Sequence, residues 1–503
     1  MTNNSKLPFE LSVDALTSWL NSLSALPQIQ AVHQLNLVLK QFKDEESRPT
    51  ELLPLLISLT PLTLHLSNAI ASAAVSEQKP IDKPRKAAKL SIQLLRQLSL
   101  LFCQLTERAN LNELEQLSAM YHALQCIGYC IRRYNLFYET PSATLWKKSA
   151  ELYNLAVEKN ALLIHLPTKI AEFKQQPTIE SVIKRNLLFS IMAPSLFTSN
   201  EISQIFQVAT EFAEQLKISA APDNLDFGFY WDLHDEIPPC PTRKSQKALP
   251  DGFMAIDAHS IGQALQQDSL TANLSIATQN KLALHLLDYQ PIFDSIIPGL
   301  TLRSEFLFGF NDVSDFLQEL NKLQKIKHFS GQNNSASKPK RNLALVPMEH
   351  ERNAFETINQ ALNKTNAVSK SGNVLTITDN NYLVVEGHAF DCSTGDIAMF
   401  YRDQEPAMLG IIRQQSALSI SNVIHILIEK ITGFYNIYTF KTTVGNRAAI
   451  VLDEDSDNAQ VFLPPGKYQV DSKIPLTIGE SLYLTACLES NSFFARFKFC
   501  FDS

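Results

Sequence analysis

The sequence predicts a multi-domain protein in which an all-α helical N-terminal region precedes an antiparallel β-barrel C-terminal domain. Three observations favour this fold class. Apolar residues recur at spacings of three and four from residue 9 to about residue 217, which is the period of helices with one buried face. From residue 373 onward, short runs rich in Val, Ile, Phe and Tyr alternate with turn residues, as strands do. A polar stretch at 328–340 separates the two patterns.

Residues 1–220 form the expected helical domain. Phe9, Val13, Leu16 and Leu20 illustrate its periodicity, because together they trace one face of a helix. Typical helix lengths and short connections predict about eight helices in this range.

Residues 221–327 are expected to pack on the helical domain. The stretch at 221–250 is rich in Pro, Asp and aromatic residues, which predicts an extended segment lying across a surface. Helical periodicity then resumes from residue 260 to about residue 327. The next stretch, 328–340, is rich in Ser, Asn and Lys and is interpreted as a solvated linker.

Residues 341–503 form the expected barrel domain. A short helix at 349–362 precedes ten predicted strands, and the last run alternates Phe497, Phe499 and Phe501 with Arg496, Lys498 and Cys500, which predicts one face toward a core. The predicted strands are 373–378, 382–390, 396–401, 408–414, 423–431, 435–442, 448–453, 461–463, 482–487 and 493–501.

Composition excludes several functional classes. The chain has 44 Lys and Arg against 51 Asp and Glu, a formal net charge of -7, which argues against binding to a nucleic-acid polymer. Phosphate-loop, dinucleotide-binding, zinc-protease and serine-hydrolase signatures are absent from the sequence. We therefore expect neither an enzyme nor a bound cofactor.

The sequence also predicts a cytoplasmic protein. Residues 1–10 lack the basic and apolar segments of a secretory signal. The most apolar stretch, 51–75, is interrupted by Pro54, Pro61 and His65, so no membrane span is expected. Seven cysteines, odd in number and without a CxxC pair, are typical of a reducing compartment.

One cluster has the spacing of metal ligands. His122, Cys126 and Cys130 lie four residues apart, so they share one helix face and, with a fourth ligand, are able to hold zinc. The alternative is a buried face with small thiols, because free cysteine is among the most buried residue types. We favour the buried thiols and expect no metal.

Five residues are candidates for binding a ligand: Arg341, Arg352, Asp391, Ser393 and Arg413. A cyclic dinucleotide presents two phosphates and several guanine edges. Guanidinium groups match both, and a carboxylate or a hydroxyl pairs with a guanine edge. The alternative is a basic linker next to an ordinary turn, since Asp, Ser and Gly are common turn residues.

The C-terminal third resembles a diverged PilZ-type domain, the small bacterial barrel that binds cyclic di-GMP. The segment 391–395 is similar to the DxSxxG turn of that family, and the pair 395–398 and 409–413 is similar to a strand pair of large proteobacterial proteins with a helical N-terminal region before a PilZ-like barrel. The resemblance implies cyclic di-GMP as the ligand.

Two functions follow from these patterns. The first is a signalling effector that binds cyclic di-GMP through the PilZ-like barrel and relays it to a protein partner. The alternative is a ligand-independent interaction adaptor with a degenerate barrel. The adaptor is favoured by two departures from the family, because no RxxxR precedes the barrel and the turn at 391–395 is one residue shorter than DxSxxG.

Overall fold

The computed structural model divides the chain into two compact units. The helical unit comprises Met1–Pro194 and Ser199–Gln290, and the barrel unit comprises Ser195–Thr198 and Pro291–Ser503. The structure describes residues 7–43, 49–76, 82–107, 111–166, 173, 176–220, 228–242, 252–267, 274–287, 301–331, 358, 360–365, 367–376, 382–388, 390–402, 407–418, 423–442, 445–454, 456 and 459–502.

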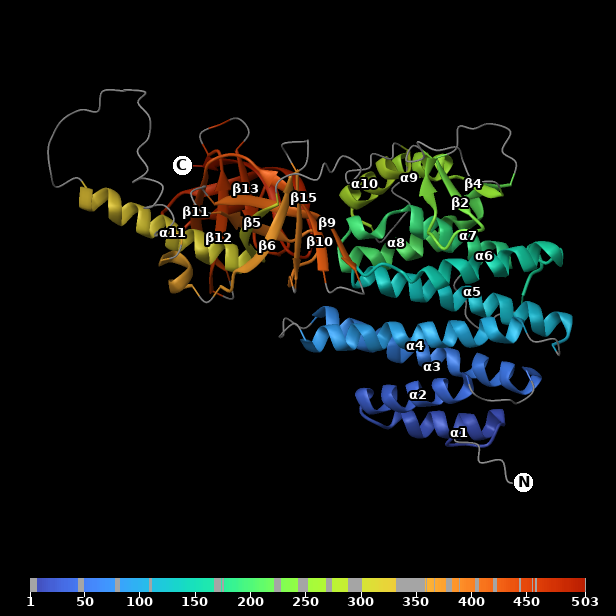
Figure 1. The fold of residues 1–503 in the computed structure, drawn as a ribbon. Coiled ribbons are helices and arrows are strands. Elements are labelled where there is room, and N and C mark those ends of the chain that lie inside the picture. Colours follow the sequence, from blue (N-terminus) through green and yellow to red (C-terminus); the bar gives the residue numbers. More distant parts are fainter. Residues whose placement is uncertain are drawn as a thin grey trace. The chain divides into compact units, whose positions relative to one another are not determined.

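Eight α-helices fill the described part of the helical unit as far as residue 212, which confirms the expected helical region. Helices α1 to α5 lie side by side in chain order (Figure 1). Asn112 and Glu115 form a capping box at the start of α5. The helices are α1 Val13–Ser24, α2 Gln28–Lys43, α3 Pro49–Ser76, α4 Asp82–Thr106, α5 Glu113–Leu136, α6 Ala143–Glu158, α7 Ile179–Ile191 and α8 Ser199–Phe212.

Helix α5 lies in the interior of the helical unit. It contacts α4, α6, α7 and α8, and most of its residues from Leu117 onward are buried. The crossing with α7 depends on Gly128, because a Cβ atom there would lie 2.1 Å from Asn186 Oδ1. Asn186 Nδ2 donates a hydrogen bond to the backbone oxygen of Leu124 at 2.9 Å, so the side chain of α7 is bonded directly to the backbone of α5.

Helix α3 combines an apolar composition with a buried position. Over Pro49–Ala73 it is long and apolar enough to cross a membrane by length and composition, and half of its most apolar window is buried in the unit. Thr60 and Thr63 are fully buried, and each hydroxyl donates to a backbone oxygen one turn earlier at 2.9 Å. Contacts with α2 and α4 give α3 the surroundings of a core helix.

The aromatic segment after α8, expected to be extended across a surface, contributes strands to a small sheet. Its order is β1-β4-β2-β3, and all of its pairs are antiparallel. Trp231 is almost fully buried beside Tyr153, with ring centroids 5.9 Å apart. The elements are β1 Lys217–Ser219, β2 Phe229–Asp232, β3 Cys240–Pro241 and β4 Phe253–Asp257, followed by α9 His259–Gln267 and α10 Ile276–Leu287.

The barrel unit contains a closed antiparallel barrel of six strands in the order β10-β7-β6-β5-β8-β9. Closure depends on β5, which pairs with β6 on one side and with β8 on the other. The expected antiparallel barrel is therefore present. Its strands are β5 Leu302–Phe308, β6 Lys370–Thr376, β7 Tyr382–His388, β8 Ile397–Tyr401, β9 Met408–Leu418 and β10 Val423–Ile431.

The structure differs from the expected boundary between the two units. The sequence places residues 221–327 with the helical domain and the linker at 328–340, whereas the barrel unit begins again at Pro291. The physical reason is the backbone pairing of β5, which is short enough to be hidden within a helix-like pattern of apolar residues. The expected linker has only Gly331 and the end of α11 within the described residues.

A second sheet of six strands follows the barrel, in the order β11-β12-β13-β16-β15-β14. A bridge between Phe440 and Leu476 brings its first strand against the end of its last, so this sheet also curls toward closure. The alternation of the final strand is confirmed, because Phe497 and Phe499 are buried. The strands are β11 Tyr435–Thr442, β12 Gly445–Leu452, β13 Gln460–Leu463, β14 Lys473–Pro475, β15 Ser481–Ser490 and β16 Ala495–Asp502.

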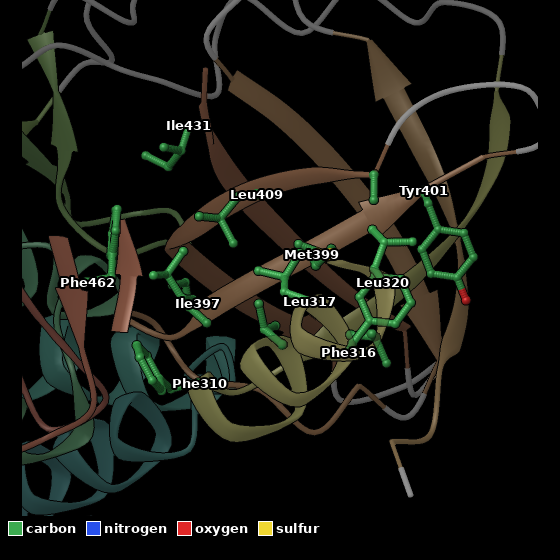
Figure 2. Close-up of a cluster of buried hydrophobic side chains, with 14 of the residues drawn as sticks. Phe310, Phe316, Leu317, Leu320, Ile397, Met399, Tyr401, Leu409, Ile431 and Phe462 are labelled. Carbon is green, nitrogen blue, oxygen red and sulfur yellow. The ribbon is translucent and has the colours of Figure 1, made fainter. Parts of the chain in front are cut away.

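Helix α11, Phe310–Gly331, joins the barrel and the second sheet into one core. It contacts β5 and β8 of the barrel and β11 and β12 of the sheet. Figure 2 shows Phe316 and Leu320 of this helix near Tyr401, while Phe310 and Phe462 lie at the other end of the same cluster. Burial of one helical face against both sheets makes the two β structures a single packing unit.

The contribution of β5 is testable with two fragments. A fragment of residues 291–503 contains every strand of the barrel and is expected to unfold cooperatively in urea, whereas residues 341–503 lack β5 and α11 and are expected to lose cooperative unfolding. Far-UV circular dichroism measures both. Equal cooperativity of the two fragments would contradict the assignment of β5 to the barrel.

A point substitution in the full chain tests the same strand. Phe306→Ala in β5 should lower the free energy of unfolding by about 3–5 kcal/mol, because its side chain is fully buried.

Candidate functional site

The candidate site is the turn between β7 and β8, which carries two of the predicted ligand-binding residues. Asp391 is exposed and Ser393 is half-buried. Within the part of the chain that the structure describes, neither side chain makes a hydrogen bond or an ion pair. The carboxylate and the hydroxyl are therefore free to bind a ligand.

The backbone of this turn is held rigidly against β9. Gly395 has a φ of 89°, a left-handed conformation that favours glycine. Its N–H donates to the backbone oxygen of Ile412 at 2.7 Å, and the N–H of Ile412 donates to the backbone oxygen of Asp396 at 2.9 Å. Asn491 Nδ2 adds a hydrogen bond to the Gly395 oxygen at 3.0 Å. The turn thus presents Asp391 and Ser393 from a fixed base.

Residue Ser195, which belongs to the barrel unit, adds a further anchor. The hydroxyl of Thr394 is buried and donates to the backbone oxygen of Ser195 at 3.0 Å. Gln414 Nε2 donates to the hydroxyl of Ser195 at the same distance. The Thr394 hydroxyl and the Gln414 amide are therefore hydrogen-bonded within the unit, in contrast to the Asp391 carboxylate.

Asp396 is a buried acid directly after the turn. Burial, with smaller contributions from the nearby carboxylates of Asp391 and Asp312, raises the pKa of its carboxyl group to about 7, while a hydrogen bond from the Ile397 N–H at 2.8 Å opposes the shift. The sequence reasoning did not select Asp396. Its only signal in the sequence is a carboxylate directly before the apolar run of β8, whose five residues are all buried.

Arg413 lies beside the turn, and its charge is already neutralised. A β-bulge in the pairing of β9 with β10 falls at Arg413, since Gln414 pairs with Leu427 and Ile412 pairs with Ile428. The guanidinium pairs with Glu429 and also with Glu489, at 2.7 Å from Nη1 to Oε1. These carboxylates raise the pKa of Arg413 despite its burial.

The site therefore differs from the predicted convergence of five residues. The structure brings Asp391, Ser393 and Arg413 to one region of the barrel, because Ile412 is bonded to the turn and adjoins Arg413. However, Arg413 is held by two carboxylates rather than left free for a phosphate. Arg341 and Arg352 lie outside the described residues.

The cysteine cluster on α5 has the surroundings expected of buried thiols. Cys126 and Cys130 are fully buried, and burial raises the pKa of the Cys130 thiol to about 12. His122 stacks on Phe102 with ring centroids 5.3 Å apart, and burial lowers its pKa to about 4. Burial therefore opposes the thiolate that zinc requires. Across the described ranges, no group of three or more His, Cys, Asp or Glu side chains has an arrangement able to hold a metal.

A comparison with known protein families finds a similarity in the helical region. Residues 14–223 match the family described as "Cyclic-di-GMP receptor FimW, N-terminal domain". This range covers α1 except Val13, all of α2 to α8, and β1. No curated protein and no solved structure matches the chain.

The titration of Asp396 predicts a pH dependence of stability. A carboxyl group with a folded-state pKa near 7 and an ordinary value of 3.8 binds its proton more tightly in the folded state. Its contribution to stability is complete below about pH 4 and is lost as the pH rises through 7, at about 1.4 kcal/mol per pKa unit. Asp396→Asn should therefore flatten the pH profile of the free energy of unfolding between pH 4 and 7. An unchanged profile would show that this carboxyl group titrates normally.

Arg413 is expected to stabilise the barrel unit through its carboxylate partners. Arg413→Met removes the guanidinium that pairs with Glu429 and Glu489 and leaves only the nearby charge of Arg496 to offset these half-buried carboxylates, which should lower the free energy of unfolding by about 3 kcal/mol. Urea denaturation of the full chain measures the loss. Lys441→Met removes an exposed cation from β11 and serves as the control, with an expected change of about 0.5 kcal/mol or less. Equal losses in the two variants would refute the role of the ion pairs.

Proposed function

We propose that the chain is a cytoplasmic signalling effector that binds cyclic di-GMP through its barrel unit and relays the signal to a protein partner. The observation that carries this proposal is the match of residues 14–223 to the N-terminal domain of a cyclic-di-GMP receptor. The seven cysteines are free thiols, which agrees with a reducing compartment.

The turn at 391–395 offers the chemistry that a guanine edge requires. A guanine base presents N–H donors that an ionised carboxylate accepts, and Asp391 is exposed with no competing partner among the described residues. Ser393 adds a hydroxyl that is able to donate or accept. We assign base recognition to these two side chains.

The phosphates require cations from another part of the chain. We assign them to Arg341 and Arg352, because a guanidinium matches a phosphate with two parallel hydrogen bonds. Arg413 has a different role in this proposal. Its ion pairs with Glu429 and Glu489 tie β9 to β10 and β15, and Ile412 of the same strand bonds to the turn, so Arg413 positions the turn rather than contacting the ligand.

The helical unit offers a surface for the protein partner. Ile29 and Leu37 on α2 are 69% and 57% exposed, and His33 between them is exposed as well. Residues spaced by four share one helix face, so these three side chains form an exposed stripe with an apolar character. Such a stripe favours docking of another protein.

A ligand-independent adaptor is the second candidate. The specific observation in its favour is the neutralisation of Arg413, because a barrel that uses its arginine in an internal ion pair has one cation fewer for phosphates. The two functions share the partner surface on α2. Binding of cyclic di-GMP distinguishes them.

Calorimetric titration of the full chain with cyclic di-GMP tests the proposal. We expect binding, and we expect Asp391→Asn to weaken it by about tenfold or more, since a hydrogen bond to a charged group contributes about 1.5–3 kcal/mol. Glu480→Gln is the matched control, because it removes an exposed carboxylate from another turn of the barrel unit. Heat changes absent from the wild type would favour the adaptor, and equal affinities of Asp391→Asn and wild type would move the site away from the turn.

A further inference from the structure

The helical unit buries an arginine that has no carboxylate partner. Arg133 on α5 is 6% exposed, and its Nη2 group donates to the neutral amide oxygen of Asn68 on α3. Its Nε–H is buried without any hydrogen-bond partner. Burying a charged group in this way is costly, so native structures normally pair it with an anion.

Two further arginines near Arg133, Arg96 and Arg132, add positive charge to the region instead of neutralising the charge of Arg133. Arg96 on α4 also has a buried Nε group without a hydrogen-bond partner. Arg132 donates to the Ser203 hydroxyl at 3.0 Å and lies over the Phe206 ring at 5.2 Å. Within the described residues, none of the three guanidinium groups has an ion pair with a carboxylate.

The electrostatics of the region agree with an excess of positive charge. Burial, and to a smaller extent the charge of Arg132, lowers the pKa of Arg133 to about 9. Arg132 itself has a lowered pKa because of burial and the charge of Arg185. Arg133 remains protonated at neutral pH, so its buried guanidinium group carries a positive charge.

Arg96 on α4 and Arg133 on α5 both lie close enough to the Cys130 thiol to interact with it electrostatically. Both guanidinium groups lower the pKa of Cys130, against the larger effect of burial. Side chains on a helix lean toward its N-terminus, so Arg133 leans from its turn of α5 toward Cys130. Asn68 is exposed, which places an opening to solvent at the α3 side of Arg133.

We propose that Arg133, with Arg96 and Asn68, binds a phosphate group of an anionic ligand in the helical unit. A phosphate accepts hydrogen bonds from both unpartnered Nε–H groups and supplies the negative charge that the region lacks. Arginine suits this role because its guanidinium is planar and always charged, and the Asn68 amide adds a neutral contact.

Two sources supply this chemistry. One is the phosphodiester of a cyclic dinucleotide, a reading that rests on the proposed function, and the other is a separate ligand that carries a phosphate. In the first case the helical unit itself contacts the dinucleotide. In the second case the helical unit has a ligand of its own.

Thermal unfolding of the full chain in a phosphate-free buffer tests the site, with inorganic phosphate, cyclic di-GMP or sodium chloride of equal ionic strength added. We expect at least one phosphate-bearing ligand to raise the unfolding temperature of the wild type more than sodium chloride does. In Arg133→Met the concentration needed for that rise should increase by about tenfold or more. Without ligand, this variant should unfold at the wild-type temperature or above, because the buried unpaired charge is gone.

Two further variants keep the test decisive. Lys40→Met removes an exposed cation of the helical unit and should respond as the wild type does. Arg133→Lys keeps the positive charge but loses the planar guanidinium group that forms two parallel hydrogen bonds with a phosphate. This variant should fold, and its unfolding temperature should respond to the ligand more weakly than that of the wild type. It therefore tests the site even if Arg133→Met fails to fold. A wild type that responds to neither ligand, or Arg133 variants that respond fully, would overturn the site.

The same measurements separate this site from the barrel site. Loss of the cyclic di-GMP response in Arg133→Met assigns the dinucleotide to the helical unit, and loss of the inorganic phosphate response alone assigns a separate ligand. Asp391→Asn should keep the inorganic phosphate response in either case. If Asp391→Asn also keeps the full cyclic di-GMP response, the proposed barrel site fails while the phosphate site of the helical unit stands.

Discussion

The cost of burying a guanidinium group is the physical constraint on the surroundings of Arg413 and Arg133. Removing such a cation from water costs several kcal/mol unless an anion or a full set of acceptors replaces the water. In the barrel unit, Glu429 and Glu489 meet that requirement for Arg413. In the helical unit, Arg133 has only an amide oxygen and an unpartnered Nε group. Arg413 therefore has anionic partners within the protein, whereas Arg133 has none among the described residues.

Much of the fold is predictable from the sequence because most elements have a local signal. The period of apolar residues identifies the helices of the first 212 residues, and the strands β10 and β11 begin and end where the sequence predicts. The strand β5 is different. Its pairing joins Leu302 to Val374 and Phe308 to Ala398, so its identity is decided by partners far along the chain. No local pattern contains that information, which explains the misplaced boundary.

The candidate site is predictable only in part, for a similar reason. The turn with Asp391 and Ser393 is recognisable because its residue types lie next to one another in the sequence. The state of Arg413 is not recognisable, because it depends on a bulge in β9 and on Glu489, a residue of another sheet. Likewise, the high pKa of Asp396 arises from burial that only the packed barrel creates. Residue identity predicts the chemistry that is available, and packing decides which groups are free.

The position of β5 in the barrel has a consequence for how the protein is made. During synthesis β5 leaves the ribosome about 70 residues before its partner β6. Until β6 is synthesised, the backbone groups of β5 are unpaired with β6, and the Phe306 side chain is not yet covered by that strand. Pairings between distant segments also form slowly, because the chain entropy lost in closing the loop precedes the gain from contacts. The nascent barrel unit therefore passes through a stage with an open apolar strand edge, and a chaperone that covers such edges is most useful at that stage.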